Sequence, residues 1–194
     1  MGDHVIDRAH TAVLIMDYQK MLVDGCVGDP EATLSKVEGL LRESRSAGIT
    51  VIYVTVGFRP GYPEVSDNNA MFSAVREGKR FQIGDEASQI PAKIKPETED
   101  SMVVKHRVSA FEGTNLGVLL RARNVDTLVL FGITTSGVVL STIRQAADLD
   151  FRMFVLEDLC YDFDDEVHQF LMKNILPKQA TVIQAETYVQ SLRV

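Results

Sequence analysis

The sequence predicts an α/β protein: a three-layer, doubly wound fold built on a mostly parallel six-stranded sheet. The first observation is that short apolar runs of four to seven residues alternate with longer amphipathic stretches. Continuous apolar runs are typical of strands that helices cover on both faces. The second is the regular order of strand and helix, because right-handed crossovers between parallel strands place helices on both faces of the sheet.

The predicted strands are six apolar runs rich in Val, Ile and Leu: 11–16, 50–56, 101–104, 127–131, 152–156 and 180–183. A helix between the first two has clear ends. Asp29, Pro30 and Glu31 give an N-cap, a proline at the first helical position and an acid in the first turn, and Gly48 is a C-terminal stop. Apolar residues at helical spacing predict further helices within 116–124, 139–150 and 164–177.

Length and composition predict a single domain over residues 1–194. The chain has 194 residues, 27 Asp plus Glu against 20 Lys plus Arg, a formal net charge of −7 and two cysteines. An acidic chain without a basic block is a poor candidate for binding nucleic acid or an anionic membrane. Two cysteines cannot form a disulfide framework, the N-terminus lacks the apolar core of a signal peptide, and no apolar run approaches the ~18 residues of a membrane span. We therefore expect a soluble, cytoplasmic protein whose partner is a small molecule.

One long irregular segment, residues 57–100, interrupts this order. It is far longer than an unstructured loop normally is, so we expect a short helix near 69–76 and another near 87–93. Its four aromatic residues, together with Arg59, are suited to covering a pocket: Phe58, Tyr62, Phe72 and Phe81. They favour two interpretations equally: a lid that covers a pocket, or a surface excursion packed on its own aromatic side chains.

Candidate functional residues follow the apolar runs, because ligands of open parallel sheets bind beyond the carboxyl ends of the strands. Asp17 follows the first run, Lys105 the third, and residues 132–137 lead from the fourth into a helix. A lysine can hold an aspartate ionised, the aspartate can transfer a proton, and free N–H groups at a helix start can stabilise an oxyanion. An aspartate at a strand end can equally be a cap, and an Asp–Lys pair a surface ion pair.

Three motifs at these positions resemble the isochorismatase-like hydrolase superfamily, which also contains nicotinamidases and other cysteine hydrolases. They are Asp17-x-Gln19 after an apolar strand, the segment VKHRVSAF over 104–111, and the block GITTSGVVLST over 132–142. The resemblance extends from Thr11 to about Val182 and implies the three-layer fold of that superfamily.

The resemblance also implies roles for particular residues. In the superfamily an Asp, a Lys and a Cys form a catalytic triad, and a cis peptide before a Thr helps to build the oxyanion hole. Asp17 is then the acid/base, Lys105 its partner, and the bond from Ile133 to Thr134 the cis peptide. The position of the nucleophilic Cys is occupied by Val138. A valine can neither ionise nor attack a carbonyl, so catalysis through a covalent thioester is excluded at this position.

Three other residues are candidates for the nucleophile. Cys26 and Cys160 lie near the strand ends in sequence, but neither begins a helix whose field would lower the thiol pKa, so we expect both to be small buried hydrophobes. Ser136 is the better hydroxyl candidate, but it lacks an obvious histidine base and can instead be a cap. The candidate substrate-binding residues are Gln19, Phe58, Arg59 and Ser136; Arg59 could bind a substrate carboxylate bidentately.

No metal or cofactor is expected. Nicotinamidase-like members carry an Asp-x-His-x-His site after the second strand, whereas residues 57–62 read GFRPGY here. The histidines, His4, His10, His106 and His168, show no metal-ligand spacing. His168 is expected to be structural, and His106 could belong to the site. No glycine-rich phosphate motif is present.

Three functions remain open. The first is hydrolysis of a vinyl ether, in which Asp17 donates a proton and water attacks without a covalent intermediate; because isochorismatases proper carry Gly rather than Val at position 138, the substrate need not be isochorismate. The second is hydrolysis of a C–N bond by water that Asp17 activates. The third is a catalytically inactive member that binds or regulates. The resemblance further implies a homodimer or homotetramer.

Overall fold

The computed structural model describes residues 6–193 and has the predicted doubly wound α/β fold. Six strands form one parallel sheet in the order β3-β2-β1-β4-β5-β6. They are β1 (Thr11–Met16), β2 (Thr50–Val56), β3 (Ser101–Lys105), β4 (Thr127–Gly132), β5 (Arg152–Leu156) and β6 (Thr181–Ile183). The chain order reverses between β1 and β4, and such a switch point is where open α/β sheets bind ligands.

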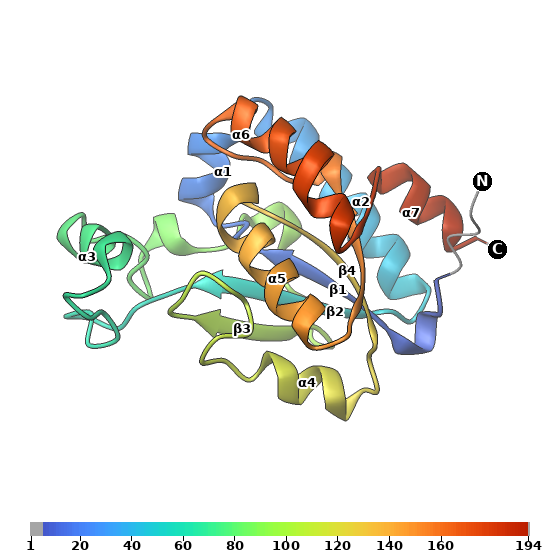
Figure 1. Ribbon diagram of the computed structural model, residues 1–194, viewed down its shortest axis with the longest axis horizontal. Coiled ribbons are helices and arrows are strands. Elements are labelled where there is room, and N and C mark those ends of the chain that lie inside the picture. The colour runs from blue at the N-terminus through green and yellow to red at the C-terminus, as the bar shows by residue number, and fades with distance from the viewer. Residues whose placement is uncertain (1–5, 194) are drawn as a thin grey trace.

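Helices cover both faces of this sheet (Figure 1). They are α1 (Lys20–Cys26), α2 (Pro30–Ser46), α3 (Ala70–Glu77), α4 (Leu116–Ala122), α5 (Leu140–Asp148), α6 (Asp165–Phe170) and α7 (Ala185–Ser191). Helices α2 and α7 contact each other on one face, and α4 and α5 lie on the other. Within residues 6–193, no helix has the length and apolar character needed to cross a membrane.

The start of α2 follows the sequence signal closely. The Asp29 carboxylate accepts a hydrogen bond from the Ala32 N–H at 3.0 Å, and Pro30 is the first helical residue. Gly48, just beyond the helix, has a φ of +76°, a left-handed conformation that favours glycine. The helix is therefore defined locally at both ends.

Several elements differ from the expectation. The helix expected near 87–93 is absent; two 3₁₀ turns, Glu86–Ser88 and Ala92–Ile94, lie there instead. Pro91 explains this, because a proline has no N–H and disfavours helical geometry at the residue before it. The helix expected within 164–177 is α6 followed by a π-helical turn, Leu171–Ile175, and a 3₁₀ turn. Helices α1 and α7 were not predicted.

The main core is made by the strands and the helix faces that cover them. All six residues of β1 and all six of β4 are buried, as expected of central strands. A second, smaller core contains Val56, Phe58, Tyr62, Phe72, Val75 and Phe81. Apart from Val56, these residues belong to the 57–100 segment, so this segment carries its own apolar packing.

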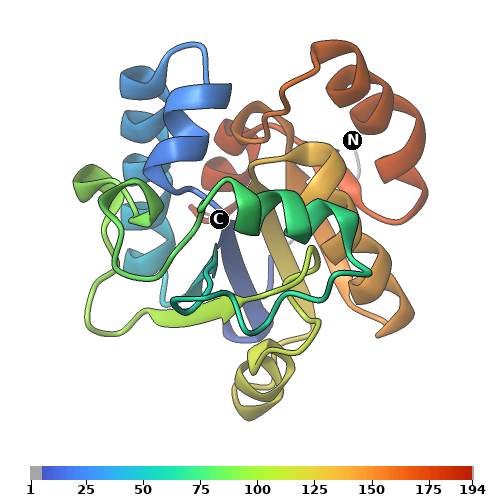
Figure 2. The same ribbon diagram turned by 90° about the vertical axis from the view of Figure 1, so that its left-hand side faces the viewer.

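The 57–100 segment crosses in front of the carboxyl ends of the strands (Figure 2). Its aromatic side chains pack on one another: the ring centroid of Phe58 lies 5.6 Å from that of Tyr62 and 5.5 Å from that of Phe72. The 57–100 segment therefore packs on its own aromatic side chains and also lies beside the carboxyl ends of the strands. Closure of the segment over a ligand stays a prediction.

Candidate functional site

Asp17 and Lys105 form a buried ion pair at the carboxyl edge of the sheet. Asp17 directly follows β1, with a left-handed φ of +57°, and Lys105 ends β3, two strands away. The Lys105 Nζ lies 2.8 Å from Asp17 Oδ2, and the two side chains are only 3% and 7% exposed. Nζ also donates to the carbonyl of Arg107 at 3.1 Å. The fold thus brings together two charges that are 88 residues apart in the chain.

The second carboxylate oxygen of Asp17 is free. Oδ1 is buried and has no hydrogen-bond partner among the described residues. Burial raises the pKa of Asp17 above its ordinary value of 3.8, although the Lys105 charge and hydrogen bond and the nearby backbone N–H of Val56, which is itself bonded to Gln19, pull it down. The carboxyl group is therefore shifted toward the pH range in which it can both give and accept a proton.

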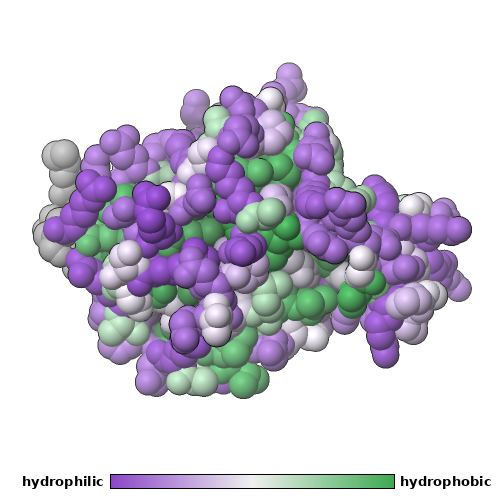
Figure 3. All heavy atoms as spheres, turned by 180° about the vertical axis from the view of Figure 1, so that it is seen from behind, coloured by the Kyte–Doolittle hydropathy of each residue, from purple (hydrophilic) through white to green (hydrophobic). Residues whose placement is uncertain are grey.

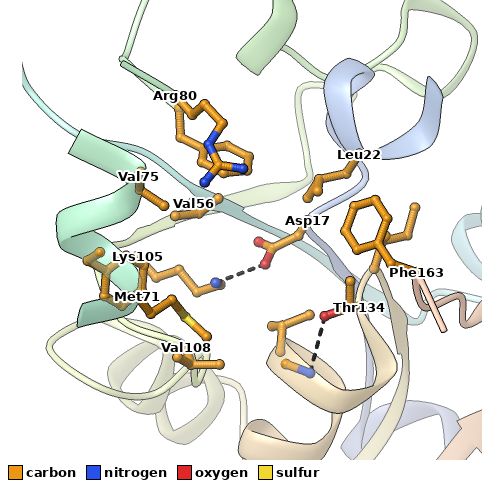
Figure 4. Close-up of a pocket in the computed structure, with 15 residues that line it drawn as sticks. Asp17, Leu22, Val56, Met71, Val75, Arg80, Lys105, Val108, Thr134 and Phe163 are labelled. Atoms are coloured by element: carbon orange, nitrogen blue, oxygen red, sulfur yellow. Dashed lines mark hydrogen bonds and ion pairs between the residues drawn. The ribbon is translucent and has the colours of Figure 1, made fainter. Parts of the chain in front are cut away.

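This pair lies in the wall of a pocket of about 300 Å³ (Figure 4). Its apolar lining includes Leu22, Val56, Phe72, Val75, Phe81 and Phe163. Its polar lining side chains are Asp17, Arg80, Lys105 and Thr134. A mainly apolar cavity with a few convergent polar groups is the usual form of a small-molecule site.

The loop after β4 forms another part of this wall. The peptide bond between Ile133 and Thr134 is cis, as the resemblance implied. The Thr134 hydroxyl accepts a hydrogen bond from the Gly137 N–H at 3.2 Å, and the Thr135 N–H donates to the carbonyl of Tyr161 at 2.8 Å. These bonds fix the loop as it enters the π-helical turn Thr135–Val139.

Val138 lies in that turn, lines the pocket and is 2% exposed. It occupies the position at which the resemblance places a cysteine. The pocket therefore has an apolar methyl surface where a thiol would be needed for covalent catalysis.

Two predicted binding residues do not line the pocket. Gln19 is buried, and its amide group binds the backbone N–H and carbonyl of Val56 at 3.1 and 3.0 Å and the carbonyl of Ser88 at 2.6 Å. It therefore joins the ends of β1 and β2 to the 57–100 segment. Ser136 is exposed, and its N–H donates to Asp162 Oδ2 at 2.6 Å.

Phe58 and Arg59 are also outside the set of described lining residues. Phe58 is fully buried in the smaller core. The Arg59 side chain is 68% exposed and pairs with Glu64. The arginine that lines the pocket is Arg80, which the sequence reasoning missed. Its only signal was its place between the amphipathic helix α3 and the aromatic Phe81.

The two thiols are poor nucleophiles in this structure. Burial raises the pKa of the Cys26 thiol to about 11 and that of the Cys160 thiol to about 12. Neither belongs to the described residues that line the pocket. Both thiols are therefore protonated near neutral pH and are not among the described side chains that face the pocket with Asp17 and Lys105.

The histidines are dispersed in the structure. His106 Nδ1 lies 2.6 Å from the carbonyl oxygen of Gly57, and His168 Nδ1 lies 2.8 Å from the Thr135 hydroxyl. His4 lies outside the described residues. In the part of the chain that the structure describes, no three His, Cys, Asp or Glu side chains come together in a way that could hold a metal ion.

The fold and the site define a doubly wound, parallel α/β protein with a buried Asp–Lys pair at the carboxyl edge of its sheet. The chain belongs to the isochorismatase family, whose "Isochorismatase domain" model matches residues 11–187. An uncharacterised isochorismatase family protein, YecD of Escherichia coli O157:H7, is 30% identical over 185 residues, which cover 94% of this chain and 96% of the relative.

Two further relatives are amidohydrolases by name. The maleamate amidohydrolase of Pseudomonas putida is 26% identical over 162 residues, covering 84% of this chain and 75% of its own. The ureidoacrylate amidohydrolase RutB of Rhizobium rhizogenes is 27% identical over 201 residues, covering 93% and 78%. Relatives of this chain thus act on C–N bonds.

Solved structures have the same architecture. An isochorismatase family protein from Burkholderia thailandensis superposes with a TM-score of 0.83 at 25% identity, covering 96% of this chain and 97% of the other. N-carbamoylsarcosine amidase from Thermoplasma acidophilum superposes with a TM-score of 0.74 at 28% identity, covering 91% and 96%.

Proposed function

We propose that this protein hydrolyses a small molecule through Asp17 and Lys105, without a covalent cysteine intermediate. The observation that carries the proposal is the unpartnered Oδ1 of Asp17, buried beside Lys105 in the pocket wall. A buried carboxylate oxygen without a partner is costly for a protein to retain. A substrate or water proton at Oδ1 would supply the missing hydrogen bond.

One reaction that fits this site is hydrolysis of a vinyl ether. Protonated Asp17 donates its proton to the terminal carbon of the double bond, which leaves an oxocarbenium centre and an Asp17 carboxylate beside Lys105. Water attacks the cationic carbon and returns a proton to Asp17. The resulting hemiketal breaks into a ketone and an alcohol. The raised pKa of Asp17 supports this route, because the protonated form is the reactive one.

The second reaction is hydrolysis of a C–N bond, which the names of the relatives favour. Here the Asp17 carboxylate takes a proton from water, and the water oxygen attacks the carbonyl carbon. The same proton then passes from Asp17 to the leaving nitrogen as the C–N bond breaks, giving an acid and an amine or ammonia. Lys105 supports the ionised state of Asp17 in which this cycle begins.

A substrate panel tests the proposal. The purified protein is incubated with isochorismate, maleamate, ureidoacrylate and N-carbamoylsarcosine, and products are measured by mass spectrometry. We expect product from at least one compound and a loss of about 100-fold or more in the Asp17→Asn variant, the size typical of an acid–base group. Reproducible ligand stabilisation without any product would instead support the alternative, an inactive member that binds or regulates.

Two expectations about the cellular state stay proposals. We place the protein in the cytoplasm because its two cysteines are free thiols. We also propose a homodimer or homotetramer, which exposed apolar residues support. Met102 and Val104 on the edge strand β3 are 45% and 42% exposed, and apolar patches interrupt the polar surface in Figure 3. Light scattering of the purified protein measures its mass against the 21.5 kDa of one chain.

A further inference from the structure

The pocket carries one positive charge more than it can neutralise. Among the described lining residues the charged ones are Asp17, Lys105 and Arg80. Asp17 and Lys105 neutralise each other across 2.8 Å. Arg80 then remains as an unmatched cation, in a protein whose formal net charge is −7. The local charge of the pocket is thus opposite in sign to that of the whole chain.

The backbone of Arg80 is held in place from both sides. Its N–H donates to the carbonyl of Val75 at 3.0 Å, and its carbonyl accepts from the Tyr62 hydroxyl at 2.9 Å. The two neighbouring residues, Lys79 and Phe81, have left-handed φ values of +49° and +58°. The chain therefore turns sharply on either side of Arg80 and fixes the direction in which its side chain leaves.

The guanidinium group itself is free. It makes no hydrogen bond or ion pair with any residue in the described range 6–193, whereas Arg59 and Arg76 in the same segment pair with Glu64 and Asp67. Arg80 follows α3 in the chain, and Figure 4 shows its side chain pointing toward the side of the pocket that holds the Asp17 carboxylate. Gly78 leaves room for this arrangement, since a Cβ at that position would lie 3.2 Å from Arg80 Nε.

We propose that Arg80 binds a carboxylate of the substrate and so selects small anionic molecules. Apolar side chains, among them Val56, Val75 and Phe81, line the same pocket as Arg80 and Asp17 and would contact the uncharged body of the substrate. An arginine presents paired N–H donors that match a carboxylate, and a charge-assisted bond of this kind is stronger than a neutral one. This assignment rests on the proposed function for the position of the scissile bond. It transfers to Arg80 the carboxylate-binding role that the sequence suggested for Arg59.

Binding of two unreactive probes tests the assignment without turnover. Benzoate and nitrobenzene have nearly the same shape, but only benzoate is charged. Calorimetry should give the wild-type protein a preference for benzoate. In the Arg80→Gln variant we expect benzoate affinity to fall about tenfold, the size expected for loss of a charge-assisted hydrogen bond, and nitrobenzene affinity to stay within about twofold. Arg80→Lys should retain part of the preference.

The matched control is Arg76→Gln, which removes one positive charge from α3 outside the pocket lining and should leave both affinities unchanged. Thermal melting of each variant checks the fold. The assignment is overturned if wild-type protein does not bind benzoate or does not prefer it, if Arg80→Gln keeps the preference, or if Arg59→Gln removes it instead. Failure of the proposed function has a different signature, namely no product from the substrate panel or full activity in Asp17→Asn.

Discussion

At the scale of single residues, the buried charges of Asp17 and Lys105 stabilise each other. Each charge is nearly removed from water, and a buried charge is tolerated when a partner and hydrogen bonds compensate for lost hydration. Replacing Lys105 by Met removes that compensation and leaves the Asp17 carboxylate unpaired.

We expect Lys105→Met to lower the free energy of unfolding by about 3–5 kcal/mol near neutral pH, the range for one broken partner of a buried pair. The double variant Asp17→Asn/Lys105→Met should recover much of this loss, because no buried charge remains. Urea denaturation measures the free energy of unfolding of the single and the double variant. The control is Lys20→Met, which breaks an exposed pair with Glu86 and should cost less than about 1 kcal/mol. Equal losses for Lys105→Met and Lys20→Met would contradict the buried-pair account.

The pKa of Asp17 gives a second prediction. Because the folded-state pKa is raised above the ordinary value of 3.8, the folded protein binds this proton more tightly than the unfolded chain does. The Asp17 contribution to stability is therefore greatest below pH 3.8 and falls as the pH rises through the folded pKa. The wild-type unfolding free energy minus that of Asp17→Asn, measured across pH, should decline over this interval. If this difference in unfolding free energy increased with pH, the folded-state pKa of Asp17 would be lowered instead of raised.

Asp17 and Lys105 were predictable from sequence because each follows an apolar run, and parallel strands end at the same edge of the sheet. Arg80 was not. Its position depends on how the chain turns after α3, and no strand end or motif marks that turn. Arg59 was the sequence candidate because an arginine on the long loop can bind a substrate carboxylate bidentately, but the structure pairs it with Glu64.

At the scale of elements, a close approach between β1 and β4 shapes the site. A Cβ on Gly132 would lie 2.7 Å from the carbonyl oxygen of Met16 and 2.9 Å from its Cβ, distances that require the two strands to move apart. Met16 precedes Asp17, and Gly132 precedes Ile133, so any separation there would also displace the pocket wall.

Gly132→Ala should therefore lower the free energy of unfolding by about 1–3 kcal/mol, as overpacking usually does. It should also reduce turnover of whichever panel compound proves to be a substrate. Gly39→Ala is the matched control: no atom lies within 4 Å of a Cβ at that position of α2, so the change should be neutral or stabilise the helix by up to about 1 kcal/mol. Denaturation curves in which the two variants behave alike would refute the close-approach argument.

Elements with strong local signals were predicted well, and those that depend on packing were not. Helix α2 has its cap, proline and glycine in the sequence. Helices α1 and α7 are seven residues each and lack a side-chain cap, so nothing local distinguishes them from loops. They are too short to be stable alone and depend on tertiary contacts.

At the scale of the whole molecule, the fold places the ends of β1, β3 and β4 around one pocket. This architecture could be predicted from the order of strands and helices in the sequence, because few topologies satisfy the rules for crossover connections. The 57–100 segment adds Phe72, Arg80 and Phe81 to the same pocket. Its contribution could not be predicted, since long-range aromatic packing rather than a local pattern positions it.

We propose that this isochorismatase-family protein works through Asp17 and without a thiol. The most direct test compares the cysteine-free variant Cys26→Ala/Cys160→Ala with Asp17→Asn, using kcat/KM for the panel compound that gives product. We predict that the cysteine-free variant stays within about twofold of wild type and that Asp17→Asn falls by about 100-fold or more. A correctly folded cysteine-free variant without activity would show that a thiol takes part in catalysis, and an Asp17→Asn variant with full activity would show that Asp17 does not.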